Sequence, residues 1–215
     1  MGKKQLQLAV DVLSLKEALE IVAEAGEFAD IIEVGTPLCI AEGARAVKEI
    51  KRLCPDKIVF ADIKVMDGGK DVPRSVIDAG CDMFSVLAAT DDNTMRDAIK
   101  LGHDNGVMVL ADFCNVPDLS KRGAEVDALG ADYLCCHVGY GRQDDGADPI
   151  EELRALEPFK TPKAIAGGIK LETAKAAVES CAQDIIVGAG ICAQPDRRAV
   201  AGKIRGIIDE FNQRA

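Results

Sequence analysis

Short apolar runs that open with Asp recur along the chain at intervals of about 50 residues, which indicates a protein built from repeated units. These runs begin at Asp30, Asp82, Asp132 and Asp184. Four further runs lie between them and end in Asp11, Asp62, Asp112 and, in the last case, Gly167-Gly168. The eight strand-length segments are each followed by room for a helix. Eight alternating β/α units predict an α/β protein with a closed (β/α)8 TIM barrel; a doubly wound open sheet is the alternative.

The composition suits this fold. Of the 215 residues, 48% are hydrophobic and 4% aromatic, and a core of Ala, Val, Ile and Leu is typical of parallel strands covered by helices. No linker or low-complexity stretch divides the sequence, so we expect a single domain over residues 1–215. The stretch after the first run has helical spacing, and Ser14 with Glu17 three positions later predicts a capping box at its start.

Charge and cysteine usage narrow the possible functions. A formal net charge of −10 argues against a nucleic-acid-binding surface. The eight Cys residues lack Cys-x-x-Cys spacing and mostly have apolar neighbours, so we interpret them as reduced core residues rather than disulfides or zinc ligands. No apolar stretch approaches the roughly 20 residues of a membrane span, and the first residues do not resemble a secretion signal. We therefore expect a cytoplasmic protein that does not cross a membrane.

Polar residues gather at one end of the predicted barrel. Active sites of (β/α)8 barrels lie at the C-terminal ends of the strands. The residues expected at those ends are Asp11, Glu33, Asp62, Lys64, Asp112, His137, the pair Gly167-Gly168 and the segment Gly188-Ala189-Gly190. Because the strand interiors are otherwise apolar, this rim is the predicted active site.

Asp62, Lys64 and Asp67 form the densest polar cluster in the sequence. Side chains alternate along a strand, so Asp62 and Lys64 are expected to point to the same side. A neighbouring carboxylate raises the pKa of a Lys, whereas a Schiff-base nucleophile needs a lowered one. We interpret Lys64 as a fixed cation that stabilises a developing enolate oxygen; a structural ion pair is the alternative.

Glu33 is expected at the end of the strand beside that of Asp62. Two carboxylates with open positions suit Mg²⁺, which keeps several waters and takes substrate oxygens as further ligands. Such an ion could bind vicinal oxygens of an enediolate and offset their charge. A solvated rim carboxylate is the alternative for Glu33.

The sequence contains two His residues. His137 ends an apolar run and is a candidate general acid or base, since imidazole titrates near neutral pH. A core His with satisfied hydrogen bonds is the alternative. His103 falls near the end of a predicted helix, and we expect it at the surface.

Glycine-rich segments follow the last two strands. Gly167-Gly168 leads into a helix predicted to begin near Leu171, and Gly188-Ala189-Gly190 follows the final strand. Backbone amides of these two adjacent loops predict a phosphate site. The glycine spacing after the final strand also resembles a dinucleotide fingerprint, but no later strand supplies the acidic residue that such a site needs.

Three longer motifs point to a known group of enzymes. The pattern Asp62-x-Lys64-x-x-Asp67 resembles the orotidine-monophosphate-decarboxylase-like superfamily. The opening Leu-Gln-Leu-Ala-Val-Asp, residues 31–38 and residues 166–173 narrow the resemblance to two sister families, the 3-hexulose-6-phosphate synthases and the 3-keto-L-gulonate-6-phosphate decarboxylases. The resemblance spans nearly the whole chain.

This resemblance implies a sugar-phosphate substrate and a reaction through an enediolate stabilised by Mg²⁺. Glu33 and Asp62 would bind the metal, while Lys64 and Asp67 would position the substrate and stabilise the intermediate. Asp67 would act near the interface of a homodimer, in the neighbouring site. The remaining implied roles are substrate hydroxyl binding for Asp11, acid/base catalysis for His137, and phosphate binding for Gly167, Gly168, Gly188, Ala189 and Gly190.

Three positions favour the synthases. The decarboxylases have Arg at the position of Tyr140, Thr at that of Ala166, and Gly-Arg where Ala189-Gly190 stands. We therefore predict a lyase that condenses formaldehyde with D-ribulose 5-phosphate to D-arabino-3-hexulose 6-phosphate, and catalyses the reverse. Arg142 could restore a cation near the site, so the decarboxylase is the alternative. A sugar-phosphate-binding barrel without catalysis is the alternative of another class.

Overall fold

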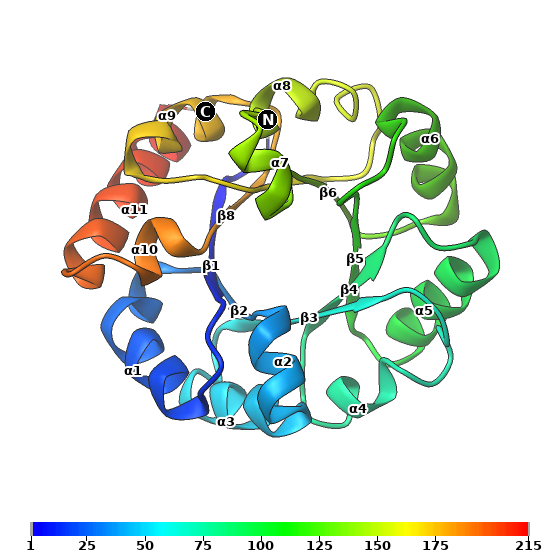
Figure 1. Ribbon diagram of the computed structural model, residues 1–215, viewed down its shortest axis with the longest axis horizontal. Coiled ribbons are helices and arrows are strands. Elements are labelled where there is room, and N and C mark those ends of the chain that lie inside the picture. The colour runs from blue at the N-terminus through cyan, green and yellow to red at the C-terminus, as the bar shows by residue number, and fades with distance from the viewer. Residues whose placement is uncertain (1, 215) are drawn as a thin grey trace.

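The structure is a computed structural model and describes residues 2–214. Its eight strands form one closed parallel barrel in chain order, as Figure 1 shows. They are β1 (Gln5–Val10), β2 (Ile31–Val34), β3 (Ile58–Val65), β4 (Met83–Leu87), β5 (Met108–Asp112), β6 (Tyr133–His137), β7 (Lys163–Ala166) and β8 (Asp184–Val187). The pairing of β1 with β8 closes the ring, so the predicted (β/α)8 barrel is confirmed and an open sheet is excluded.

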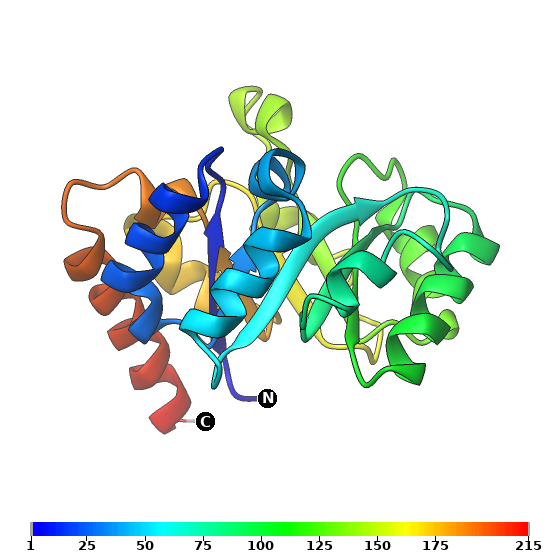
Figure 2. The same cartoon turned by 90° about the horizontal axis from the view of Figure 1, so that it is seen from below.

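Helices surround the barrel, most of them on its outside (Figure 1). They are α1 (Leu15–Ala25), η1 (Gly26–Phe28), α2 (Thr36–Glu42), α3 (Ala44–Leu53), α4 (Arg74–Ile77), α5 (Asp92–Asp104), α6 (Leu119–Leu129), α7 (Tyr140–Asp144), α8 (Pro149–Leu153), α9 (Leu171–Glu179), α10 (Ala189–Cys192) and α11 (Arg197–Arg214). Both termini lie at one end of the barrel, and α2 and the yellow-green α7 project at the other (Figure 2). Within residues 2–214, no helix is both long and apolar enough to cross a bilayer.

The pleat of the strands divides the core into two apolar layers. Along β1, Leu6, Leu8 and Val10 belong to the layer that packs against the helices. Residues of alternate parity, such as Phe60 and Leu110, fill the barrel interior. The inward-facing positions continue up each strand to the rim, so the fold directs polar residues at the strand ends into one space. All eight cysteines are free thiols, as expected.

The start of α1 differs from the prediction. Ser14 occupies the N-cap position, but its side chain makes no capping hydrogen bond, so the predicted capping box with Glu17 is wrong. The N–H of Leu15 instead donates to Oε1 of Glu42 on α2, at 3.2 Å. A carboxylate from a neighbouring helix thus satisfies one of the free N–H donors in the first turn of α1, although not one that the capping box would have satisfied.

Candidate active site

A cavity of about 770 Å³ opens at the C-terminal ends of the strands. Its lining includes every residue of the predicted rim, namely Asp11, Glu33, Asp62, Lys64, Asp112, His137, Gly167, Gly168, Gly188, Ala189 and Gly190. Asp67 is the exception among the predicted site residues, because it lies on the exposed loop after β3 and does not line the cavity within the described part of the chain. Its carboxylate accepts a hydrogen bond from the N–H of Gly68 at 2.6 Å.

Strand β3 is irregular where it carries the central residues of the site. Its register with β4 shifts between Ala61 and Val65, as in a β-bulge. Lys64 has a φ of 44°, in the left-handed region that side-chain-bearing residues rarely adopt. Its N–H donates to the hydroxyl of Ser85 on β4 at 2.9 Å. Strain of this kind persists where the surrounding contacts hold it.

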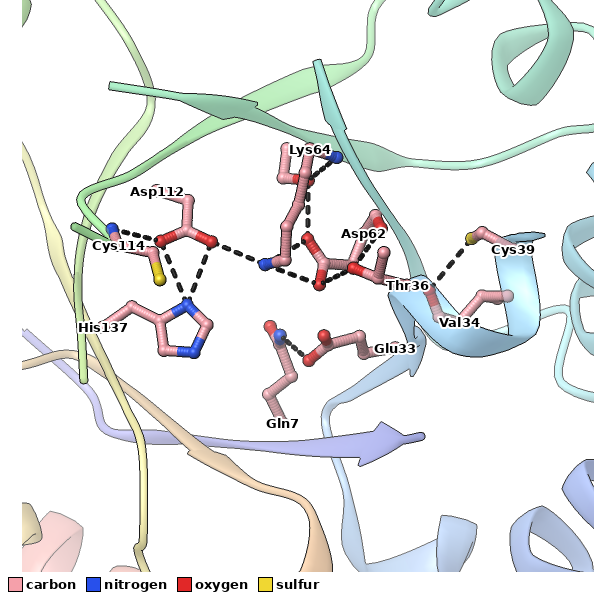
Figure 3. A network of polar contacts seen from close by, with 11 residues as sticks. Gln7, Glu33, Val34, Thr36, Cys39, Asp62, Lys64, Asp112, Cys114 and His137 are labelled. Atoms are coloured by element: carbon pink, nitrogen blue, oxygen red, sulfur yellow. Dashed lines mark hydrogen bonds and ion pairs between the residues drawn. The ribbon is translucent and has the colours of Figure 1, made fainter. Parts of the chain in front are cut away.

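Lys64 lies between two carboxylates (Figure 3). Its Nζ is 2.9 Å from Oδ2 of Asp62 and 2.7 Å from Oδ2 of Asp112. Burial alone would lower the pKa of Lys64, but the charges of Asp112 and Asp62 outweigh it and raise the pKa above its ordinary value. A raised pKa favours the protonated amine, which suits a fixed cation better than a Schiff-base nucleophile.

Asp112 joins Lys64 to the candidate acid/base. Its two carboxylate oxygens lie 3.1 and 3.0 Å from Nδ1 of His137. Burial would raise the pKa of Asp112, but the hydrogen bond and charge of His137, together with Lys64, lower it below its usual range. With Nδ1 facing Asp112, the other ring nitrogen of His137 is left for a substrate. The sequence placed Asp112 on the rim but suggested no role, because its partners come from other strands.

Glu33 lies beside this network, deeply buried (Figure 3). Its Oε2 accepts a hydrogen bond from Nε2 of Gln7 at 2.6 Å. Burial first, and then the negative charges of Asp62 and Asp11, raise the pKa of Glu33 well above its usual value. A carboxylate held this close to others is stabilised as an anion by a bound cation.

Asp62 shares its oxygens among several donors. Oδ1 accepts from the hydroxyl of Ser85 at 2.7 Å, and Oδ2 lies 2.7 Å from the hydroxyl of Thr36. Among the described residues, no group of three or more acidic, His or Cys side chains is placed to hold a metal. Mg²⁺ nevertheless needs one or two carboxylates when waters and substrate complete its shell. Glu33 and Asp62 are compatible with that requirement.

Glycines let the loops after β6, β7 and β8 pack together. Gly167 has a φ of 105°, and a Cβ there would overlap the carbonyl oxygen of Val138. A Cβ on Gly190 would overlap the carbonyl oxygen of Ile169. Only glycine permits these close approaches of backbone to backbone. Lys170 follows in the same region and also lines the cavity, which sequence analysis missed because it lies beyond the strand end.

Arg142 and His103 lie away from the cavity. Arg142 on α7 donates to both carboxylate oxygens of Glu152, with Nη1 3.0 Å from Oε2, and lies outside the cavity lining found in residues 2–214. The guanidinium of Arg142 is thus paired with Glu152, so the structure lends no support to the suggestion that Arg142 supplies a free cation to the site. His103 is exposed, 3.0 Å from Asp132, as predicted.

Known proteins resemble this chain along almost its entire length. Residues 4–204 match the model of the Orotidine 5'-phosphate decarboxylase / HUMPS family. A curated 3-hexulose-6-phosphate synthase of Bacillus subtilis (strain 168) is 42% identical over 206 residues, which cover 95% of this chain and 98% of the relative. A synthase of that name from Staphylococcus aureus (strain bovine RF122 / ET3-1) is 37% identical over 95% of this chain and 99% of its own.

Solved structures agree with this assignment. The 3-hexulose-6-phosphate synthase from Salmonella typhimurium has a TM-score of 0.93 at 37% identity, with 96% of this chain and 99% of that chain covered. The 3-keto-L-gulonate-6-phosphate decarboxylase from Vibrio cholerae O1 biovar El Tor has a TM-score of 0.86 at 25% identity, covering 98% and 99%. The resemblance inferred from the motifs is thus confirmed, and the named relatives are enzymes, the synthases being lyases. The chain belongs to the Orotidine 5'-phosphate decarboxylase / HUMPS family.

Proposed function

We propose that this enzyme catalyses the reversible aldol condensation of formaldehyde with D-ribulose 5-phosphate to D-arabino-3-hexulose 6-phosphate. Relatives named 3-hexulose-6-phosphate synthase, at 42% and 37% identity, support this choice. The observation that carries the proposal is the position of the Lys64 amine in the cavity, with Nζ 2.9 Å from Oδ2 of Asp62 and 2.7 Å from Oδ2 of Asp112. A fixed positive charge at this place suits a reaction in which a sugar oxygen becomes negative.

In the proposed mechanism His137 moves the proton. Its free ring nitrogen takes the proton from C1 of the bound ketose, while Asp112 holds Nδ1 and stabilises the imidazolium that forms. The ammonium of Lys64 stabilises the oxygen on which negative charge develops. C1 then forms a bond to the carbon of formaldehyde, and the resulting alkoxide takes the proton back from His137. Lys64 remains protonated throughout.

We propose Mg²⁺ as the cofactor, held by Glu33 and Asp62. When bound, it would offset negative charge on neighbouring substrate oxygens. Its positive charge would also stabilise the anionic form of Glu33, whose pKa is raised first by burial and then by the charges of Asp62 and Asp11. Asp11, on the same rim, is proposed to contact substrate hydroxyls.

The glycine-rich loops after β7 and β8 are the proposed binding site for the phosphate end of the substrate. We propose that backbone amides near Gly167, Gly168, Gly188, Ala189 and Gly190 bind its phosphate, with Lys170 as a nearby cation. Asp67 is exposed and is not part of the cavity lining found in residues 2–214 of its own chain. We therefore propose a homodimer in which Asp67 serves the partner's site.

A comparison of two substrates tests the proposed reaction. The enzyme with Mg²⁺ is incubated with formaldehyde plus D-ribulose 5-phosphate, and separately with 3-keto-L-gulonate 6-phosphate. We expect formaldehyde to be consumed in the first reaction and little CO₂ to be released in the second. Predominant CO₂ release would instead support the decarboxylase, and binding of both sugars without turnover would support a non-catalytic barrel.

A further inference from the structure

We propose that Ser85, on β4, is a positioning residue for the reaction, which holds Lys64 and Asp62 in their working geometry. This inference rests on the proposed function. The Ser85 side chain is fully buried, with 0% exposure, and lies outside the cavity lining found in residues 2–214. Ser85 therefore acts through its two neighbours and has no direct route to a substrate.

The hydroxyl of Ser85 makes two hydrogen bonds, one as an acceptor and one as a donor. It accepts from the backbone N–H of Lys64 at 2.9 Å and donates to Oδ1 of Asp62 at 2.7 Å. One hydroxyl carries one hydrogen and two lone pairs, so the two bonds do not compete. A single side chain thus fixes the backbone of one central residue and the carboxylate of the other.

The bond to Lys64 matters because β3 is irregular there. The bulge interrupts the pairing of β3 with β4 between Ala61 and Val65, so the N–H of Lys64 needs an acceptor from outside the ladder. Lys64 is also strained, with its φ of 44°. The Ser85 hydroxyl supplies the missing acceptor and thereby stabilises the strained backbone from which the Lys64 side chain extends.

The bond to Asp62 fixes the orientation of its carboxylate. Ser85 contacts Oδ1, while Thr36 lies 2.7 Å from Oδ2, so the carboxylate is held from both sides. Loss of the Ser85 hydroxyl would leave the Lys64 N–H unpaired and remove the shortest contact to Oδ1 of Asp62, so that only the Lys64 ammonium, at 3.2 Å, would still bond that oxygen. Displacements of about 1 Å in such groups can lower rates by about 100-fold.

Three substitutions at Ser85 separate hydrogen bonding from packing. Ser85→Ala removes the hydroxyl, Ser85→Cys keeps a similar volume but bonds weakly, and Ser85→Thr keeps the hydroxyl. We expect kcat to fall about 30-fold in the Ala and Cys variants, with KM changed less than about two-fold, and to recover most of the loss in Ser85→Thr. If Ser85→Ala does not fold, Ser85→Cys carries the test.

Ser180 provides a matched control. Its hydroxyl also donates once and accepts once, to the carbonyl of Ala177 at 2.6 Å and from the N–H of Ala182 at 3.2 Å, away from the cavity lining. Ser180→Ala should lower the thermal midpoint and leave kcat unchanged. A kcat of Ser85→Ala or Ser85→Cys within about two-fold of the wild type would overturn the assignment.

A crystal structure of metal-free Ser85→Cys gives a readout that does not depend on activity. We expect Lys64 to leave the left-handed region and its Nζ to move relative to Asp112. An unchanged φ of Lys64, with Nζ in place, would contradict the positioning role even if the proposed reaction is correct. Conversely, a wild-type enzyme without the aldol activity would contradict the proposed function. The φ of Lys64 in the variant would then still test whether Ser85 fixes the backbone of Lys64.

Discussion

At the scale of single residues, the partners of Lys64 bear most directly on the chemistry. Replacing Lys64 by Ala removes a positive charge that is already in place before the reaction. We expect kcat/KM to fall by roughly 100- to 1000-fold or more, as when one preorganised donor to a developing anion is lost. Steady-state kinetics with D-ribulose 5-phosphate and formaldehyde measure the change. Lys175→Ala, which removes an exposed partner of Glu179, should keep full activity, whereas a fully active Lys64→Ala enzyme would refute the role.

The raised pKa of Glu33 predicts that the binding of Mg²⁺ depends on pH. Burial and the charges of Asp62 and Asp11 raise its pKa, so protons compete with a cation at higher pH than they do at an ordinary Glu. We expect the affinity for Mg²⁺, measured by isothermal titration calorimetry, to weaken as the pH falls through this raised pKa. Glu33→Gln should bind Mg²⁺ at least about 10-fold more weakly and lose most of that pH dependence. An unchanged affinity in Glu33→Gln would remove Glu33 from the proposed metal site.

The sequence was enough to predict the position of some site residues, but not the contacts of others. Strand alternation predicted Asp62 and Lys64 on one side, and their side chains do meet, with Nζ 2.9 Å from Oδ2. The bulge in β3 means, however, that regular alternation does not describe the backbone between them. Asp112 and Ser85 contact Lys64 from other strands, and the contacts exist only once the barrel has set the register between them. No local pattern carries that information, so their partners could not be predicted.

At the scale of elements, the loops after β7 and β8 depend on glycine. In Gly190→Ala the new methyl group would overlap the carbonyl of Ile169 and push the two loops apart. We expect KM for D-ribulose 5-phosphate to rise about ten-fold, with a smaller effect on kcat, because the proposed phosphate site loses its shape. Steady-state kinetics measure both constants.

Gly206, on α11, is the control for this change. A Cβ there meets nothing within 4 Å, so Gly206→Ala should leave KM unchanged. It should also stabilise the fold by about 0.5–1 kcal/mol, as expected for Ala in place of Gly inside a helix. An unchanged KM in Gly190→Ala would show that the close packing of these loops does not shape the phosphate site.

The strands themselves were predictable, whereas their irregularities were not. The repeated apolar runs marked all eight strands, and the pair Gly167-Gly168 marked the approach to α9, which begins at Leu171. The bulge in β3 shows only in its register with β4, and the N–H of Leu15 at the start of α1 is satisfied by Glu42 of another helix. Both depend on a neighbour distant in sequence, so periodicity along the chain could not reveal them.

At the scale of the whole molecule, the exposed position of Asp67 predicts shared active sites. In a mixed dimer of one Lys64→Ala subunit and one Asp67→Ala subunit, one site would contain both intact residues and the other neither. Mixed dimers purified through two different tags should therefore have about half the wild-type activity, although each variant alone is nearly inactive. Mixed dimers as inactive as their parents would show that Asp67 does not act across the interface.

The pairing of β1 with β8, which closes the barrel, has a consequence for folding while the protein is being translated. This pairing joins the first strand of the chain to the last, with Gln5 paired to Asp184. On the ribosome β8 emerges long after β1, so β1 spends most of translation with one edge bare. The nascent chain cannot complete its ring until that late strand arrives. A chain released before β8 is made would therefore leave β1 and β7 each with an unpaired edge.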